Sequence, residues 1–211
     1  MGTAVLNPGA NKFSAGEILM APITAAVPTL AASGGKFGPT SAWTGWQKLG
    51  GTTTGFTLSV VPTTADFMVQ ESFYPMHIIQ TTETADATFT LAELSRAALA
   101  YVFNAGSAAS VTGTGGSFAT TGASGTAFAQ FTPPLIGQQF RAMVGWQSEF
   151  DDEVIFLYQT LNTATVAPVR AKGPQEAALA FNCRSELPAT NPDTNCGATS
   201  TMVTPFRWYM V

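Results

Sequence analysis

The chain has 211 residues, of which 45% are hydrophobic, so it is long enough to bury a sizeable core. Charged residues make up only 10% of the chain, well below the roughly 25% usual in soluble domains, and the net charge is -4. Nine lysines and arginines are too few for a basic surface that grips nucleic acid, and so little charge indicates that part of the surface meets other copies of the chain.

The beginning of the chain predicts an arm followed by a strand. Residues 1–16 carry Asn-Pro-Gly and little periodicity, which is typical of an extended N-terminal arm, and a first strand is expected at about 17–24. The apolar run in this region lacks a basic start and is interrupted by Pro22 and Pro28. We therefore expect neither a secretion signal nor a membrane span.

Residues 31–51 are a loop by their Gly, Ser and Pro content, yet the loop contains four large apolar side chains. Two accounts stay open. In the first, these side chains fold back onto the core of their own subunit. In the second, 31–51 is an assembly loop that becomes ordered against a neighbouring subunit, so that Trp46→Ala would suppress polymerisation without unfolding the subunit. The candidate contacts between subunits are Phe37, Trp43, Trp46 and Leu49.

Alternation of apolar and polar residues after this loop predicts half-buried antiparallel strands. Strands are expected at 55–61 and, interrupted by Pro75, at 66–80, and the two-residue rhythm continues to residue 90. Four further strands are expected at about 138–150, 153–161, 176–184 and 203–211.

One stretch, 90–104, changes to helical periodicity. A Thr-x-x-Glu capping box begins at Thr90, and Asn104 is suited to end the helix. Leu99 and Phe103 lie on the flank of the apolar stripe, where they either widen the core face or contact the next subunit. The stripe itself, which is expected to pack on a sheet, consists of Leu91, Leu94, Ala98, Tyr101 and Val102.

The sequence indicates no catalytic or cofactor chemistry. His77 is the single histidine and lies in an apolar strand candidate, so we expect a buried, hydrogen-bonded side chain rather than a member of a Ser-His-Asp triad. Cys183 and Cys196 either pair or stay reduced, and two cysteines are too few for a four-ligand zinc site. The acidic residues 151–153 are typical of a hairpin tip. We expect no enzyme activity, no cofactor and no metal.

Residues 105–137 form a Gly-, Ser- and Thr-rich excursion that is nearly free of charge. So few large apolar groups cannot build a core, which predicts a long loop or a loose hairpin outside the fold.

Short motifs between residues 45 and 104 resemble a known family. A W-x-x-L-G-x-T pattern at 46–52 precedes the strands, and a Thr-rich strand then runs into Leu-Ala-Glu at 91–93 and one helix. In this order the chain resembles the major tail protein, or tail tube subunit, of long-tailed bacteriophages. The C-terminal half resembles that family more loosely.

The resemblance implies a mainly β fold over residues 1–211, an antiparallel β-sandwich or incomplete barrel with one flanking helix at about 90–104, which forms a ring-shaped shared barrel on oligomerisation. Hexameric rings would stack into the tail tube of the virion and conduct double-stranded DNA without sequence-specific binding. The implied partners are further copies of the chain, a tape measure protein, a tail terminator and distal tail or baseplate proteins. Assembly would take place in the host cytoplasm, without a membrane.

Polar strand faces are the candidate lining of such a tube. A conduit must not bind the DNA that it conducts, and neutral or acidic side chains do not hold phosphates. Arg141 is the exception on one of these faces, and we expect an acidic side chain beside it. The hypothesised lumen-facing residues are Gln70, Ser72, Thr82, Asp86, Thr88, Gln147 and Glu149.

A second hypothesis keeps the sandwich but changes its role. The chain would then be a virion decoration or tail-surface module that binds polysaccharide. Such a module would stay monomeric or trimeric, whereas a tube subunit forms rings or tubes.

Overall fold

The computed structural model describes residues 16–31, 33–39, 42–68, 74, 76–92, 95–105, 117–121, 128–135, 137, 139–167, 178–195 and 202–211. The predicted N-terminal arm, apart from Gly16, lies outside these residues, as do Gln70, Ser72 and Cys196.

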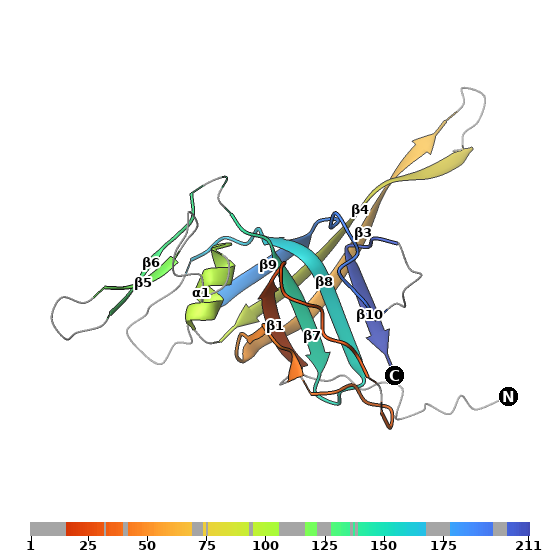
Figure 1. Ribbon diagram of the computed structural model, residues 1–211. Helices are drawn as coiled ribbons and strands as arrows, with labels where there is room; N and C mark the ends of the chain where they lie inside the picture. Colours follow the sequence, from red (N-terminus) through yellow and green to blue (C-terminus); the bar gives the residue numbers. More distant parts are fainter. Residues whose placement is uncertain are drawn as a thin grey trace.

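The described residues form ten β-strands and one short helix, so the fold is mainly β as the sequence predicts (Figure 1). Eight strands make one antiparallel sheet with the order β2-β1-β7-β8-β9-β4-β3, in which β10 also pairs with β8, and β5 and β6 make a separate hairpin. The strands are β1 (Gly16–Pro22), β2 (Gln47–Lys48), β3 (Thr52–Phe67), β4 (His77–Leu91), β5 (Ser117–Thr121), β6 (Phe128–Thr132), β7 (Ala142–Ser148), β8 (Glu153–Asn162), β9 (Leu179–Ser185) and β10 (Phe206–Met210).

The large sheet folds over on itself into two packed layers, and β8 is the strand at which it divides. The first part of β8 pairs with β10, whereas its last residues, 160–162, pair with β9. One layer therefore consists of β2, β1, β7, β8 and β10, and the other of β9, β4 and β3, which cross behind it in Figure 1. Ile18 and Leu157 of the first layer share a core with Phe89 and Phe181 of the second. This open sheet is consistent with the predicted sandwich.

The outer face of β1, β7 and β8 is covered by described residues of the predicted loop at 31–51, which we call the tryptophan loop. Trp43 and Trp46 pack on Phe156 of β8, with ring centroids 5.2 and 5.8 Å away, and the indole of Trp46 donates a 2.9 Å hydrogen bond to the carbonyl of Ala26. The first of the two accounts of this loop is therefore the one found. The four candidate subunit contacts are buried in their own subunit, with exposed fractions of 8% for Phe37, 6% for Trp43, 8% for Trp46 and 1% for Leu49.

Burial on both faces also corrects the expectation of half-buried strands for β7 and β8. Val144 faces the core between the layers, whereas its neighbour Met143 faces the tryptophan side, and both are fully buried. In β8, Leu157 faces the core between the layers and Phe156 faces the tryptophan side. A strand in the middle of three layers buries consecutive residues, and this is what a continuous apolar run indicates.

The helix is shorter than predicted. Helix α1 (Arg96–Val102) begins after Ser95, whose hydroxyl accepts a 3.0 Å hydrogen bond from the backbone amide of Ala98. Thr90 is not its N-cap, because β4 continues through Thr90 and is paired there with strands on both sides. Sheet pairing thus overrides a local capping signal. Asn104 ends the helix as predicted, with a φ of 54° in the left-handed region.

Helix α1 packs its apolar side into the core between the two layers. Ala98, Tyr101 and Val102 are buried there, as the stripe predicts, and the Tyr101 hydroxyl donates to the carbonyl of Met20 at 3.4 Å. Burial raises the pKa of Tyr101. On the flank, Phe103 is half-buried against the same core. The helix therefore forms part of the core rather than a cover on an otherwise finished sheet.

Cys183 on β9 is a free thiol with no exposed surface, so the account without a disulfide is the one found. Burial raises the pKa of this thiol to about 12. Because the thiolate is the reactive form, we expect Cys183 in a Cys196→Ser variant to resist a water-soluble thiol reagent at pH 8 and to react fully in denaturant. Reaction of the native variant at the denatured rate would contradict this burial.

Candidate assembly surfaces

β3 and β4 form a hairpin that extends far beyond the sandwich (Figure 1). At its base, Phe56 and Leu58 pack against the core between the layers. Farther out, nearly all side chains are exposed, and we call residues 60–68 and 76–84 the arm. The strand predicted at 66–80 is therefore wrong, because β3 ends and β4 begins within that range.

Large apolar side chains are unusually exposed on this arm. Their exposed fractions run from 40% for Val60 to 66% for Ile78. A two-stranded ribbon without a second layer is marginally stable alone, and contiguous exposed apolar surface marks an interaction site. The arm is thus a candidate contact with another molecule. Its exposed apolar residues are Val60, Val61, Phe67, Met68, Met76, Ile78 and Ile79.

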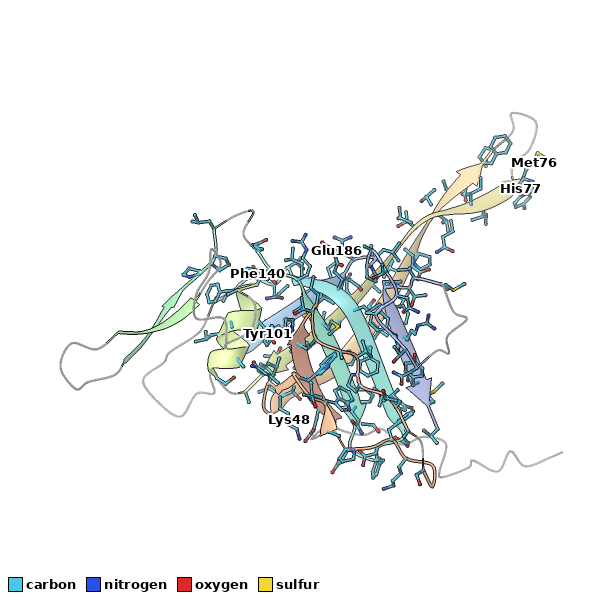
Figure 2. All side chains as sticks on the ribbon, viewed as in Figure 1. Lys48, Met76, His77, Tyr101, Phe140 and Glu186 are labelled. Carbon is cyan, nitrogen blue, oxygen red and sulfur yellow. The ribbon has the colours of Figure 1, made fainter. Side chains whose placement is uncertain are left out.

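His77 lies near the end of the arm, beside Met76 (Figure 2). Its side chain is exposed, so the expected burial is wrong. The apolar residues around it in the sequence belong to the arm rather than to a core strand. Its place on a projecting ribbon, away from the sandwich, leaves it without the enclosed setting that a triad needs.

The outer face of β3, β4 and β9 carries polar side chains, and we call it the open face. The register places two rows of residues directly opposite one another across the three strands. Residues opposite one another in antiparallel strands point to the same side, and the alternate residues Ala85, Ala87 and Phe89 of β4 are buried. The rows are Thr57, Thr88 and Asn182, and Ser59, Asp86 and Arg184.

Three of the hypothesised lumen-facing residues share this side of the hairpin. Thr88 and Asp86 lie on the open face, and Thr82 lies four residue pairs beyond Asp86 on the arm, where it is exposed. The face also includes one residue that sequence reasoning missed, Arg184, which lies opposite Asp86. A cross-strand pair of opposite charges leaves the face close to neutral.

Gln147 and Glu149 do not join this face. Gln147 is 1% exposed, and its amide donates 2.8 Å hydrogen bonds to the carbonyl of Gly38 and to Asp151 Oδ1. Gln147 anchors the tryptophan loop, so the prediction that it lines the tube is wrong. Glu149 is exposed, but it lies in the turn after β7, in the other layer. The prediction failed because β7 is covered on both faces.

Arg141 has an acidic neighbour, Glu186, as predicted from the sequence. Its guanidinium forms a two-pronged pair with Glu186, at 3.0 Å from Nε and 2.9 Å from a terminal nitrogen, and Gln159 also donates to Glu186 at 2.9 Å. The hydrogen bond from Arg141 lowers the pKa of Glu186 against the opposing effect of desolvation. The positive charge of Arg141 is therefore compensated locally.

This pair predicts a small pH dependence of stability. Because the pKa of Glu186 is lowered in the folded state, its contribution is present above the unfolded pKa of about 4.3 and is lost as the pH falls through the folded value. The pair is partly exposed, so we expect less than about 1 kcal/mol. Urea midpoints at pH 7 and pH 3 should differ more for the parent than for Glu186→Gln. An equal pH dependence of the two proteins would show that the pair makes no net contribution to stability.

A second polar cluster holds the chain on the outer face of β8. The hydroxyls of Tyr158 and Tyr209 both donate to Asp193, a carboxylate that is 4% exposed. Burial, and then the hydrogen bond to Asp193, raise the pKa of Tyr158. Next to it, Asn195 donates to the carbonyl of Pro28 at 2.8 Å. The cluster ties the segment before β10 to the loop after β1, which is a structural role.

Two cavities bordered by described residues offer little chemistry. One of about 360 Å³ lies between residues 26–30 and the segments 38–39 and 42–44, and none of the residues that line it has an ionisable side chain. A second, of about 240 Å³, is bordered by Lys48 and Glu17, which pair with each other at 2.7 Å. Among the described residues, no group of three or more His, Cys, Asp or Glu side chains could hold a metal ion.

In the part of the chain that the structure describes, no helix has the length and apolar character needed to cross a membrane. A scan of the sequence against models of protein families finds no match. A search of the curated proteins finds no match either.

Proposed function

We propose that the protein is a tail tube subunit of a tailed bacteriophage, which closes into rings that stack into a tube for double-stranded DNA. The observation that carries this proposal is the open face, a polar sheet surface on which Thr88 and Arg184 are exposed and which continues into a projecting arm with exposed apolar side chains. A lone globule needs neither feature. A subunit whose sheet lines a bore and whose arm grips its neighbours needs both.

The charges of the open face suit a conduit. Asp86 lies directly opposite Arg184, and the remaining residues of the two rows are neutral. Duplex DNA carries one negative charge per about 1.7 Å, so unpaired lysines or arginines repeated along a tube would accumulate strong adhesion. A near-neutral polar lining lets the duplex slide.

The dimensions also suit a conduit. The open face consists of three adjacent strands, β3, β4 and β9. If six subunits each supply these three strands, ~18 strands with ~4.8 Å spacing and ~40° tilt give a circumference of about 110 Å. The backbone diameter is then about 36 Å, which leaves a bore of about 26 Å inside the side chains.

The other parts of the proposal follow the resemblance in the sequence. That family's assembly includes a hexameric ring and a place in the virion tail. It also includes three kinds of partner: the tape measure protein, the terminator and the distal tail proteins. The proposal includes no catalytic step and no cofactor.

Electron microscopy of the purified protein tests the proposal. Negatively stained samples over a range of concentrations should contain rings, and tubes at the higher concentrations. Their central hole should stay open when short duplex DNA is added, and the DNA should not sediment with them at physiological salt. A protein that stays monomeric or trimeric at high concentration, as expected for a polysaccharide-binding surface module, would overturn it.

A further inference from the structure

Exposed apolar side chains gather in two separate segments of this chain. Of the 17 large hydrophobic residues that are exposed in the described part, eight lie between Val60 and Ile79 and four between Met202 and Val211. The first segment is the arm and its end, and the second is β10 with its flanks. In Figure 1 the arm points away from β10, so the two segments do not cover each other within one subunit.

β10 offers a free strand edge. It pairs with β8 on one side, from Phe206 opposite Leu157 to Met210 opposite Glu153, and has no strand on its other side among the described residues. Trp208 and Met210, on one face of β10, are 51% and 67% exposed. An apolar edge without proline or lysine is open to an added strand.

The arm offers a matching edge. β9 pairs with β4 only from Asp86 onward, so residues 77–85 of β4 have one unpaired edge in the described structure. This stretch contains no proline, whereas the β3 side of the arm contains Pro62, which cannot donate a hydrogen bond to an added strand. The β4 side is therefore the better edge for pairing.

The charges of the two segments have opposite signs. The described residues of the arm carry Asp66 and Glu83 and no lysine or arginine, and both acids are exposed. Residues 202–211 carry Arg207 and no acidic side chain. Glu153 lies at the opposite end of β10, beside Met210. The acidic arm therefore suits the end of β10 at which Arg207 lies.

We infer that the arm of one copy adds, through its β4 edge, to the free edge of β10 in a second copy. Ile78 and Ile79 point to opposite faces of the arm, so one of them would cover Trp208 and Met210. The donor and the acceptor are different parts of the chain, so the contact runs head to tail and generates a ring or an open helical array. The inference rests on the proposed function and names the interface by which the copies of a tube join.

Disulfide trapping in assembled protein tests the interface, because a disulfide requires Cα atoms within about 4.4–6.8 Å. In a Cys196→Ser background, cysteine is placed at Ile78 or Ile79 together with cysteine at Trp208 or Met210. At least one of the four pairs should give a ladder of multimers on a non-reducing gel, collapsing to monomer on reduction. The matched control pairs each arm cysteine with Leu187→Cys, which is 64% exposed but outside both segments.

The outcomes separate the inference from the proposed function. Rings under the microscope with a ladder from an arm and β10 pair, and none from the control, support both. Rings with no ladder from any of the four pairs, or with an equal ladder from the control, overturn the interface and leave the tube. If neither the parent nor the folded variants form rings, the interface and the proposed function are both overturned.

Discussion

Replacing Ile78 and Ile79 together by threonine is expected to stop ring and tube formation at concentrations at which the parent chain assembles, and to leave the subunit folded. Both side chains are more than half exposed in the subunit, at 66% and 56%. Threonine keeps the β-branched shape that favours strands, so the hairpin itself should persist. Exposed substitutions of this kind usually change stability by less than about 0.5 kcal/mol.

The expected loss of assembly follows from the apolar surface that the contact would bury. Burying an isoleucine side chain contributes about 1.5–3 kcal/mol, and one of the two isoleucines would cover β10, so the double replacement removes roughly 2 kcal/mol from each contact between subunits. Since about 1.4 kcal/mol corresponds to a tenfold change in an equilibrium constant, the critical concentration should rise by about 30-fold. Sedimentation and negative staining over a concentration series measure this change.

Leu187→Thr is the control for this experiment. Leu187 is as exposed as the two isoleucines but lies outside the arm and outside β10, so its replacement should leave the critical concentration near that of the parent. Thermal melting of all the variants shows whether the subunit stays folded. An arm variant that polymerises like the parent would remove the arm from the assembly mechanism.

The strands were predictable because their signal is local. Alternation in β9 and the closing run of β10 gave boundaries within a few residues. Of the acidic residues 151–153, the first two lie in the turn between β7 and β8, with Asp151 at a φ of 59°, and Glu153 begins β8. The helix boundary failed for a non-local reason. β4 is held between two other strands through Thr90, and such pairing outweighs the capping pattern that the same residues carry.

The place of the tryptophan loop could not be predicted from the loop. Its Gly-, Ser- and Pro-rich composition is the same whether the loop packs on its own subunit or on a neighbouring subunit. The deciding signal lies elsewhere, in the unbroken apolar runs at 18–21 and 154–158. Such runs indicate strands buried on both faces, so some segment had to cover the second face.

The candidate lining was only partly predictable. Thr82, Asp86 and Thr88 fall on one side of one strand by simple alternation, which the sequence shows. The register also contains an irregularity between the pairs Thr63–Thr82 and Thr64–Gln80, where a bulge shifts the parity of the outer arm. Alternation gives no information on where a ribbon leaves its core, so the exposure of Ile78 and Ile79 had no signal in the pattern.

The second large effect is expected at the contact between Gly145 and the two buried tryptophans. Gly145 lies on β7 beneath both rings, and a Cβ there would come within 2.7 Å of Trp43 Cζ3 and 2.9 Å of Trp46 Cζ3. Gly145→Ala must therefore displace indoles that Phe156 and the Ala26 carbonyl hold from other sides. We expect a loss of about 1–3 kcal/mol in the free energy of unfolding, as for other overpacked cores.

Trp43→Ala should cost more, about 3–5 kcal/mol, because it removes a side chain that is only 6% exposed and leaves a cavity. For a chain of this length that is a fall of about 10 °C in Tm, measurable by calorimetry or circular dichroism. Adding Gly145→Ala to Trp43→Ala should cost less than it does alone, because the new methyl group then occupies vacated space. The matched control, Trp208→Ala, removes a side chain that is already half in water and should lower Tm less. A Trp43→Ala protein with an unchanged Tm that no longer forms rings would instead return the tryptophan loop to a role between subunits.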